Sequence, residues 1–226
     1  MTTFVPFGPD HWAVMAALGA ACAFLVANTK RLRTLRTDAV VRRVLALVLV
    51  GNEVGSWGVA VSQGRWGLPC QLCDLAVFLM AWVLLGRRRL IGELAVLWGL
   101  AGSLQAVLTP DLSAGFLSYP WIQFFLGHGA VVLSAVYLVV RGRVTLTGRS
   151  VWRVWLISNV YVVIAGLLNW RLATNFGYLA RKPVTPSLLD WLGPWPWYLV
   201  GMEVLALGLF FCCVGFNRVV DRMARV

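Results

Sequence analysis

The order of apolar and polar residues divides the chain into seven long apolar stretches separated by short polar connections. Each stretch has about the 20 residues that a helix needs to cross the hydrocarbon core of a bilayer, and none alternates as a strand would. A backbone in lipid has to satisfy its own hydrogen bonds, so we expect seven helices. They run roughly over residues 11–28, 44–62, 69–86, 90–108, 120–140, 151–169 and 194–216.

The composition supports this interpretation. Of the 226 residues, 60% are hydrophobic and only 13% are charged, against about 25% charged residues in an ordinary soluble domain. We therefore predict an all-α membrane protein, a seven-transmembrane helix bundle in which residues 1–226 form a single domain. The first stretch has no basic residues before it and no Ala-x-Ala end, so we expect a retained span and not a cleaved signal peptide.

The positive charges follow the topology. Sixteen of the 20 Lys and Arg residues, Arg87 among them, fall in or beside the connections after the first, third and fifth stretches and in the tail. The positive-inside rule then predicts an N-terminus outside and a C-terminus in the cytoplasm, in a cell membrane. Trp and Tyr residues such as Trp66 gather at the other side and form an aromatic belt. On that side we expect the segment 170–193 to fold back as a lid over the outer mouth of the bundle. Because topology explains the charge, we expect no nucleic-acid partner.

A small set of polar residues lies inside the stretches, mostly in their outer halves. An ionisable group at mid-helix costs about 2.5–3.5 kcal/mol on insertion scales, so each such group needs a partner or a cavity. We predict one polar cavity open to the outside or to the outer leaflet, with Glu93 as an exception that pairs with the inner arginines. The residues expected to line the cavity and bind substrate are His11, Glu53, Gln71, Gln105, Gln123, Asn159, Asn169 and Glu203.

Cysteine and aspartate residues gather at the start of the third stretch. Cys70, Cys73 and Asp74 have the spacing i, i+3 and i+4, which places them on one helical face. The positive end of the helix dipole favours a thiolate there. If His128 approaches, a Cys–His pair oriented by a carboxylate has the groups needed for acyl transfer through a thioester. The sequence leaves open whether Cys70, Cys73 or neither is the nucleophile.

Other functions remain as alternatives. A transporter, or a lipid-binding or small-molecule-binding protein without catalysis, would use the same cavity with Glu53 and Glu203 as proton or cation sites. A weaker alternative is a membrane thiol redox protein built on Cys70 and Cys73. The sequence has no P-loop, G-x-S-x-G or H-E-x-x-H motif. It therefore implies neither a soluble cofactor nor a resident metal.

Several strings together resemble a known family. They are Phe7 with His11, Leu68-Pro69-x-x-Leu72-Cys73-Asp74, residues 102–111, residues 124–129, Asn169, Lys182-Pro183 and residues 187–198. The pattern resembles the YwaF-like family of bacterial integral membrane proteins, related to the animal transmembrane protein 164. The resemblance implies a seven-helix bundle with its N-terminus outside.

The same resemblance implies a function. The animal relative is similar to a cysteine-dependent acyltransferase that moves a fatty acyl chain between phospholipid and lysophospholipid without coenzyme A. The expected partner is therefore a membrane phospholipid or lysophospholipid. The animal pattern would map its cysteine onto Cys70, and bacterial members have His where this chain has Gln71.

Overall fold

The computed structural model describes residues 3–65, 67–86 and 88–225 and shows a protein built of helices and their connections. Within these residues no strand forms, and Thr3 and Ala114 make an isolated bridge. Trp66 and Arg87, predicted to join the aromatic belt and the inner basic residues, lie outside the described residues. The elements are α1 (Pro9–Ala27), α2 (Thr29–Arg33), α3 (Asp38–Ser62), α4 (Leu72–Leu85), α5 (Arg89–Trp98), the π-helical turn η1 (Gly99–Ser103), α6 (Leu104–Leu108), α7 (Tyr119–Val140), α8 (Gly148–Leu172), the 3-10 turns η2 (Phe176–Tyr178) and η3 (Leu188–Leu192), and α9 (Trp197–Arg225).

Each predicted apolar stretch forms a helix, which confirms the all-helical prediction. In the described part of the chain, six helical segments are long and apolar enough to cross a membrane: α1, α3, the continuous segment Arg89–Leu108, α7, α8 and α9. The third stretch differs, because α4 has only 14 residues. At 1.5 Å per residue this gives about 21 Å, less than the roughly 30 Å of a bilayer's hydrocarbon core.

The start of α4 lies later than the sequence predicted, at Leu72 and not at residue 69. Gln71 has extended backbone angles (φ −67°, ψ 148°) and forms the N-cap, and the Asp74 carboxylate accepts a hydrogen bond from the Gln71 amide at 3.0 Å. This contact satisfies an amide that the helix itself leaves unpaired. Cys70 therefore precedes the helix, and the expected common helical face of Cys70, Cys73 and Asp74 does not form.

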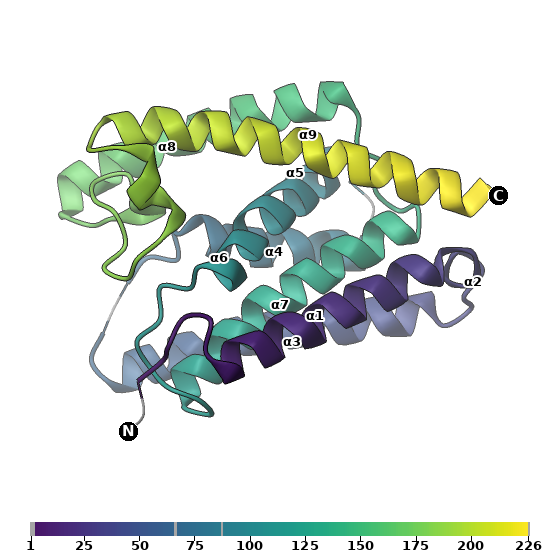
Figure 1. Cartoon of the computed structure of the whole chain (residues 1–226), viewed down its shortest axis with the longest axis horizontal. Coiled ribbons are helices and arrows are strands. Elements are labelled where there is room, and N and C mark those ends of the chain that lie inside the picture. Colours follow the sequence, from purple (N-terminus) through teal and green to yellow (C-terminus); the bar gives the residue numbers. More distant parts are fainter. Residues whose placement is uncertain (1–2, 66, 87, 226) are drawn as a thin grey trace.

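The centre of the bundle consists of α7 and the segment Arg89–Leu108. Their apolar windows are 61% and 56% buried, whereas those of α1, α3, α8 and α9 are at most 17% buried. Figure 1 shows α1, α3 and α7 together on one side and α8 with α9 on the other, with α4 and α5 between them. The outer helices thus expose apolar faces, as helices in contact with lipid do.

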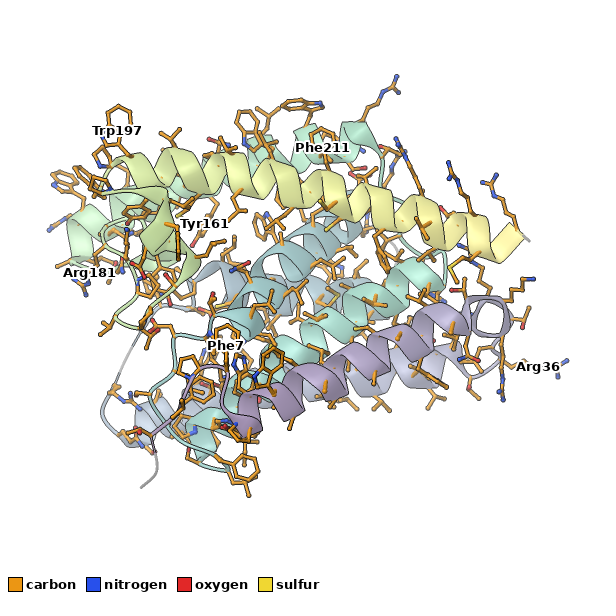
Figure 2. The ribbon with its side chains drawn as sticks, viewed as in Figure 1. Phe7, Arg36, Tyr161, Arg181, Trp197 and Phe211 are labelled. Carbon is orange, nitrogen blue, oxygen red and sulfur yellow. The ribbon has the colours of Figure 1, made fainter. Side chains whose placement is uncertain are left out.

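Arginine side chains gather at one end of the bundle, where α2 and the C-terminus lie (Figures 1 and 2). We call this the basic end. There, Glu93 of α5 is fully buried and accepts hydrogen bonds from Arg89 at 3.1 Å and Arg153 at 2.8 Å, which confirms the predicted pairing of Glu93 with arginine. A second carboxylate, that of Asp38, is bound by Arg42, Arg141, Arg143 and Tyr137.

Gly99 allows three helical segments to approach closely at η1. A Cβ added to Gly99 would lie 2.9 Å from a side-chain carbon of Val131 in α7 and 3.1 Å from one of Met80 in α4. Because these distances are shorter than van der Waals contact, Gly99 sets how closely α4 and α7 pack on the central segment.

We expect Gly99→Ala to destabilise the protein by about 1–3 kcal/mol, because the added methyl group has to displace packed side chains. Gly102→Ala is the matched control, since it lies in the same π-helical turn and no atom lies within 4 Å of a Cβ built there. Thermal unfolding of both purified variants in detergent measures the difference. Equal losses of stability in the two would contradict this account of the packing.

Candidate functional site

The start of α4 brings a thiol and a carboxylate together. Cys73 Sγ lies 3.6 Å from Asp74 Oδ1, so the thiol can donate to this oxygen, while Oδ2 receives the Gln71 amide. With both oxygens engaged, the Asp74 carboxylate is held in a fixed orientation beside the sulfur. All five cysteines of the chain are free thiols.

Two further helices reach this pair. Glu53 of α3 is buried and lies close enough to Asp74 and Cys73 for its charge to act on both. Tyr161 of α8 donates a hydrogen bond to the carbonyl oxygen of Cys70 at 3.0 Å. We call these residues the cysteine cluster: Glu53, Cys70, Cys73, Asp74 and Tyr161. Sequence reasoning missed Tyr161, although a tyrosine in the middle of an apolar helix was a usable signal, because its hydroxyl needs a partner.

The connection between α8 and α9 folds back over the cysteine cluster, in agreement with the lid predicted for residues 170–193. Gly177 donates its amide to the side-chain oxygen of Gln71 at 2.9 Å. Its φ of +64° is one that glycine adopts without strain. A Cβ at Gly177 would also lie only 3.1 Å from the Tyr161 hydroxyl. Glycine therefore permits both the turn and its close approach to the cluster.

Asn169 holds this turn in place. Its side-chain oxygen accepts hydrogen bonds from the Phe176 amide at 2.7 Å and the Thr174 hydroxyl at 2.9 Å, and its side-chain NH2 donates to the Phe176 carbonyl at 3.0 Å. The residue is buried. Asn169 was predicted to bind substrate, and in the structure its polar atoms are used to position Gly177.

A second contact ties the same connection to the segment that follows α6. The Tyr178 hydroxyl donates to the Asp111 carboxylate at 3.0 Å, and the Thr185 hydroxyl donates to the other oxygen at 2.8 Å. Burial, together with the neighbouring Asp111 charge, raises the pKa of Tyr178 above its ordinary value, so the hydroxyl remains a protonated donor. The sequence had suggested only an aromatic belt for Tyr178.

His128 makes no hydrogen bond to either cysteine in the described part of the chain. Its Nδ1 donates to the Phe124 carbonyl of its own helix at 2.9 Å, and the two rings stack at 4.3 Å. Nearby, Asn52 of α3 donates to the Gln123 carbonyl at 3.2 Å, and a Cβ on Gly127 would lie 2.7 Å from the Asn52 nitrogen. Here α3 and α7 pack on each other, and the Cys–His pair expected from the sequence is not formed.

His11 is fully buried and joins the N-terminal segment to α6. Its Nδ1 accepts the Phe7 amide at 2.9 Å, so Nε2 carries the hydrogen and donates to the Val107 carbonyl at 2.7 Å. The rings of Phe4, Phe7 and Phe125 surround it at centroid distances of 5.3–5.8 Å. Both ring nitrogens are thus used for structural contacts.

The remaining predicted binding residues lie in separate contacts. Glu203 of α9 accepts hydrogen bonds from Trp155 at 2.6 Å and Asn159 at 3.3 Å, both on α8. Gln105 bonds within its own turn, and Gln123 contributes its backbone carbonyl to α3. No hydrogen bond among the described residues links these groups to the cysteine cluster, so the structure does not show the single shared cavity that the sequence suggested.

The other three cysteines face apolar surroundings. Cys22, Cys212 and Cys213 line an apolar groove of about 370 Å³ between α1, α6, α7 and α9. Across residues 3–65, 67–86 and 88–225, no group of three or more His, Cys, Asp or Glu side chains is placed to hold a metal ion.

A comparison with models of known protein families identifies the family to which the chain belongs. The model of the TMEM164 family matches residues 6–214. The chain belongs to the TMEM164 family. The match supports the relation to transmembrane protein 164 and not the narrower YwaF-like grouping. Neither the search of curated proteins nor the search of solved structures gave a match.

Membership of the TMEM164 family agrees with the helices. Six apolar helical segments of spanning length in the described residues, together with the family, indicate a multi-pass membrane protein. The family match also includes α4 and the turn that covers it, so the cysteine cluster lies wholly within the matched region.

In this TMEM164-family protein we expect Asn169→Ala to loosen the turn over the cysteine cluster, because three hydrogen bonds are lost at a buried site. Unpaired buried groups cost about 1–3 kcal/mol each. Hydrogen–deuterium exchange should rise in residues 173–180, and the melting temperature should fall. Asn28→Ala removes one local hydrogen bond at the basic end and is the control. Unchanged exchange in residues 173–180 would show that Asn169 does not hold the turn.

Proposed function

We propose that this protein transfers fatty acyl chains between membrane lipids through a thioester on Cys73. The observation that carries the proposal is the 3.6 Å contact between Cys73 Sγ and the Asp74 carboxylate. A thiol becomes a nucleophile by losing its proton, and Asp74 is an acceptor within reach. For a site in a membrane protein, the nearest ester-bearing substrates are phospholipids and lysophospholipids.

The proposed reaction has two steps. In the first, the Cys73 sulfur attacks an ester carbonyl of a diacyl lipid and its proton passes to Asp74. The ester C–O bond breaks, and the lysolipid oxygen leaves with that proton. In the second, a lysolipid hydroxyl gives its proton to Asp74 and attacks the thioester. The C–S bond breaks, and Asp74 passes that proton to the leaving sulfur to restore the thiol. If water replaces the lysolipid, the result is hydrolysis. Acyl exchange conserves oxidation state, so no redox cofactor enters the scheme.

Neighbouring groups have roles that fit this chemistry. Glu53 is buried and Asp74 is half-buried, and the two lie near enough for their charges to interact, so Glu53 offers a second carboxylate beside the proton path. The side-chain oxygen of Gln71 accepts from Gly177, and its NH2 group has no acceptor among the described residues, so it can donate to an oxyanion. We assign proton transfer to Asp74 because its carboxylate lies 3.6 Å from the sulfur, whereas His128 makes no hydrogen bond to either cysteine within the described residues.

We also propose that α4 is a seventh span, with the N-terminus outside, the C-terminus in the cytoplasm of the cell membrane, and the whole chain as one domain. A helix of 14 residues needs polar partners at both ends if it lies within the membrane. Asp74 and Gln71 provide them at one end, and Arg42 donates to the Leu84 carbonyl at the other. The concentration of arginine at the basic end supports a cytoplasmic position for that end.

This topology predicts opposite labelling at two exposed positions. In a variant lacking the five native cysteines, Val184→Cys on intact cells should react with a membrane-impermeant maleimide, because Val184 is 97% exposed in the connection before α9. Arg36→Cys at the basic end should react only after the membrane is opened. Labelling of Arg36→Cys on intact cells would reverse the orientation.

For the acyl-transfer proposal, the purified protein is incubated with phospholipid and examined by mass spectrometry. We expect an acyl adduct on Cys73 that disappears in Cys73→Ala. Asp74→Asn should slow lipid turnover by about 10²–10⁴-fold, the range typical of a lost general base. Asp74→Asn keeps the size of the side chain, and Cys73→Ala removes only the sulfur.

Two control variants make the test specific. Cys22→Ala removes a thiol in the apolar groove and should leave turnover unchanged. Cys70→Ala distinguishes the two cysteines at the start of α4. Because the Cys70 thiol makes no hydrogen bond to a carboxylate within the described residues, this variant should still form the acyl adduct on Cys73. Unaltered turnover in the Cys70→Ala/Cys73→Ala double variant would refute the proposal.

Proton-coupled transport is a second candidate, and the closeness of Glu53 to Asp74 favours it. A pair of interacting carboxylates inside a membrane protein is typical of a proton-carrying site. The sequence had suggested Glu53 with Glu203, but Glu203 is bound by α8 residues. If Glu53→Gln abolishes pH-dependent uptake in vesicles while Cys73→Ala does not, transport is the better assignment.

A further inference from the structure

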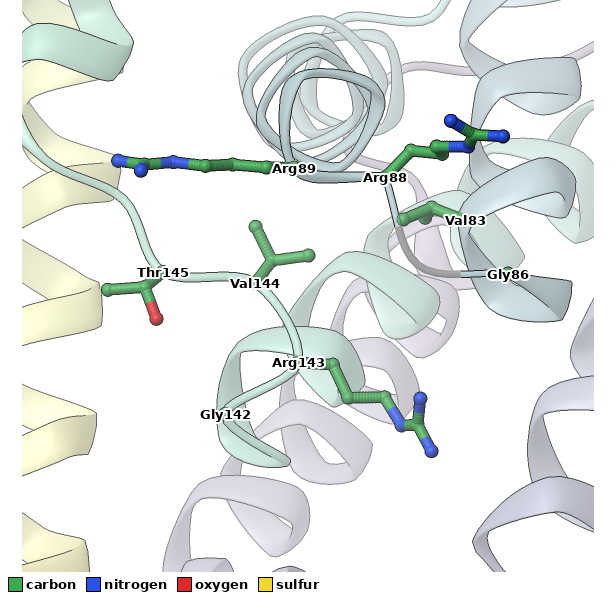
Figure 3. A pocket seen from close by; sticks show the side chains of 8 residues that line it. All are labelled: Val83, Gly86, Arg88, Arg89, Gly142, Arg143, Val144 and Thr145. Carbon is green, nitrogen blue, oxygen red and sulfur yellow. The ribbon is translucent and has the colours of Figure 1, made fainter.

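A cavity at the basic end lies outside the cysteine cluster. It has a volume of about 480 Å³, within the range of about 300–1,000 Å³ that small-ligand pockets occupy. Its walls come from the end of α4, the start of α5 and the connection between α7 and α8. Figure 3 shows Arg88 and Arg89 extending in opposite directions at the start of α5, with Val144 and Thr145 below them.

The charge around this cavity is not balanced. Arg143 on one wall shares the Asp38 carboxylate with Arg42 and Arg141. On the other wall, Arg89 shares Glu93 with Arg153, and Arg88 has no carboxylate partner among the described residues. Six guanidinium groups therefore meet two carboxylates, which leaves an excess of four positive charges. An anion in the cavity would reduce their mutual repulsion.

Donors in the cavity walls are available for such an anion. The Nε of Arg143 is buried and has no hydrogen-bond partner in the described part of the chain. At the start of α5 no side chain caps the helix and no acidic residue lies in the first turn, so the positive end of its dipole is uncompensated. Guanidinium groups match the geometry of phosphate oxygens particularly well.

The surroundings of the cavity favour a lipid as the source of the anion. Three large apolar side chains, each next in sequence to a residue of the wall, are exposed: Trp82 (56%), Leu85 (62%) and Leu90 (43%). In a membrane protein such side chains face acyl chains, and tryptophan favours the headgroup region. We propose that this cavity binds the phosphate group of an anionic phospholipid headgroup from the leaflet that the basic end faces.

The test uses the full-length protein in detergent with phosphatidylglycerol or phosphatidylcholine as the probe, and native mass spectrometry to count retained lipid. The wild type should retain phosphatidylglycerol in preference, because the choline cation is repelled by the excess arginines. Arg88→Gln should weaken retention about tenfold, the effect of one charge-assisted hydrogen bond, and Arg88→Gln/Arg89→Gln should weaken it further. Since Arg88 pairs with no carboxylate in the described residues, its variant should fold normally.

Arg36→Gln is the matched control, because Arg36 is exposed at the same end and does not line the cavity (Figure 2). It should keep phosphatidylglycerol retention within about twofold, as expected for a surface charge outside the site. Equal losses of phosphatidylglycerol retention in Arg36→Gln and Arg88→Gln would overturn the proposal, because the lipid would then be held by the overall positive charge of this end and not by the cavity. Displacement of the lipid by millimolar inorganic phosphate would show that the cavity binds free phosphate and not a lipid headgroup. Acyl turnover at Cys73 is not part of this test, so either proposal can fail alone.

Discussion

The hydrogen bond between the Asp74 carboxylate and the Gln71 amide is the contact on which the candidate site depends. It begins α4 at Leu72 and leaves Gln71 extended. In this conformation the Cys70 carbonyl accepts a hydrogen bond from Tyr161, and the Gln71 side-chain oxygen accepts one from Gly177. The same carboxylate lies beside the sulfur of Cys73. This one capping contact therefore positions the start of α4, the Gly177 turn that packs on it and the proposed nucleophile.

The short helix α4 also connects the two regions with polar chemistry. At one end it carries the cysteine cluster. At the other, Arg42 binds both the Leu84 carbonyl and Asp38, whose carboxylate is shared with Arg143 in the cavity wall. Between these ends, Met80 packs against the backbone of Gly99 in the central segment. If α4 spans the membrane as proposed, the proposed acyl-transfer site and the proposed phospholipid cavity belong to opposite leaflets.

Hydropathy predicted the helices well because the length of an apolar run is a local property of the sequence. The pairing of Glu93 with Arg89 was also predictable, since residues four apart meet on a helix. The position of His128 was not predictable. In helices that are apolar on all sides, periodicity does not define which face turns inward. That rotation is set by packing, here by Gly127 against Asn52. For the same reason the polar residues that were predicted to share one cavity instead make hydrogen bonds between several different pairs of helices.

His11 uses both of its ring nitrogens in hydrogen bonds, and His128 keeps Nε2 free but makes no hydrogen bond to either cysteine in the described residues. The bases that lie beside Cys73 in the cysteine cluster are carboxylates. Proton transfer from a thiol to a carboxylate is uphill, so the chemistry is slower than with an imidazole of matched pKa. In a membrane, however, the substrate is held beside the enzyme and is not diluted in water, and such proximity lowers the barrier. If the protein transfers acyl chains as proposed, Asp74 and Glu53 are the groups that carry the proton between thiol and lipid under these conditions.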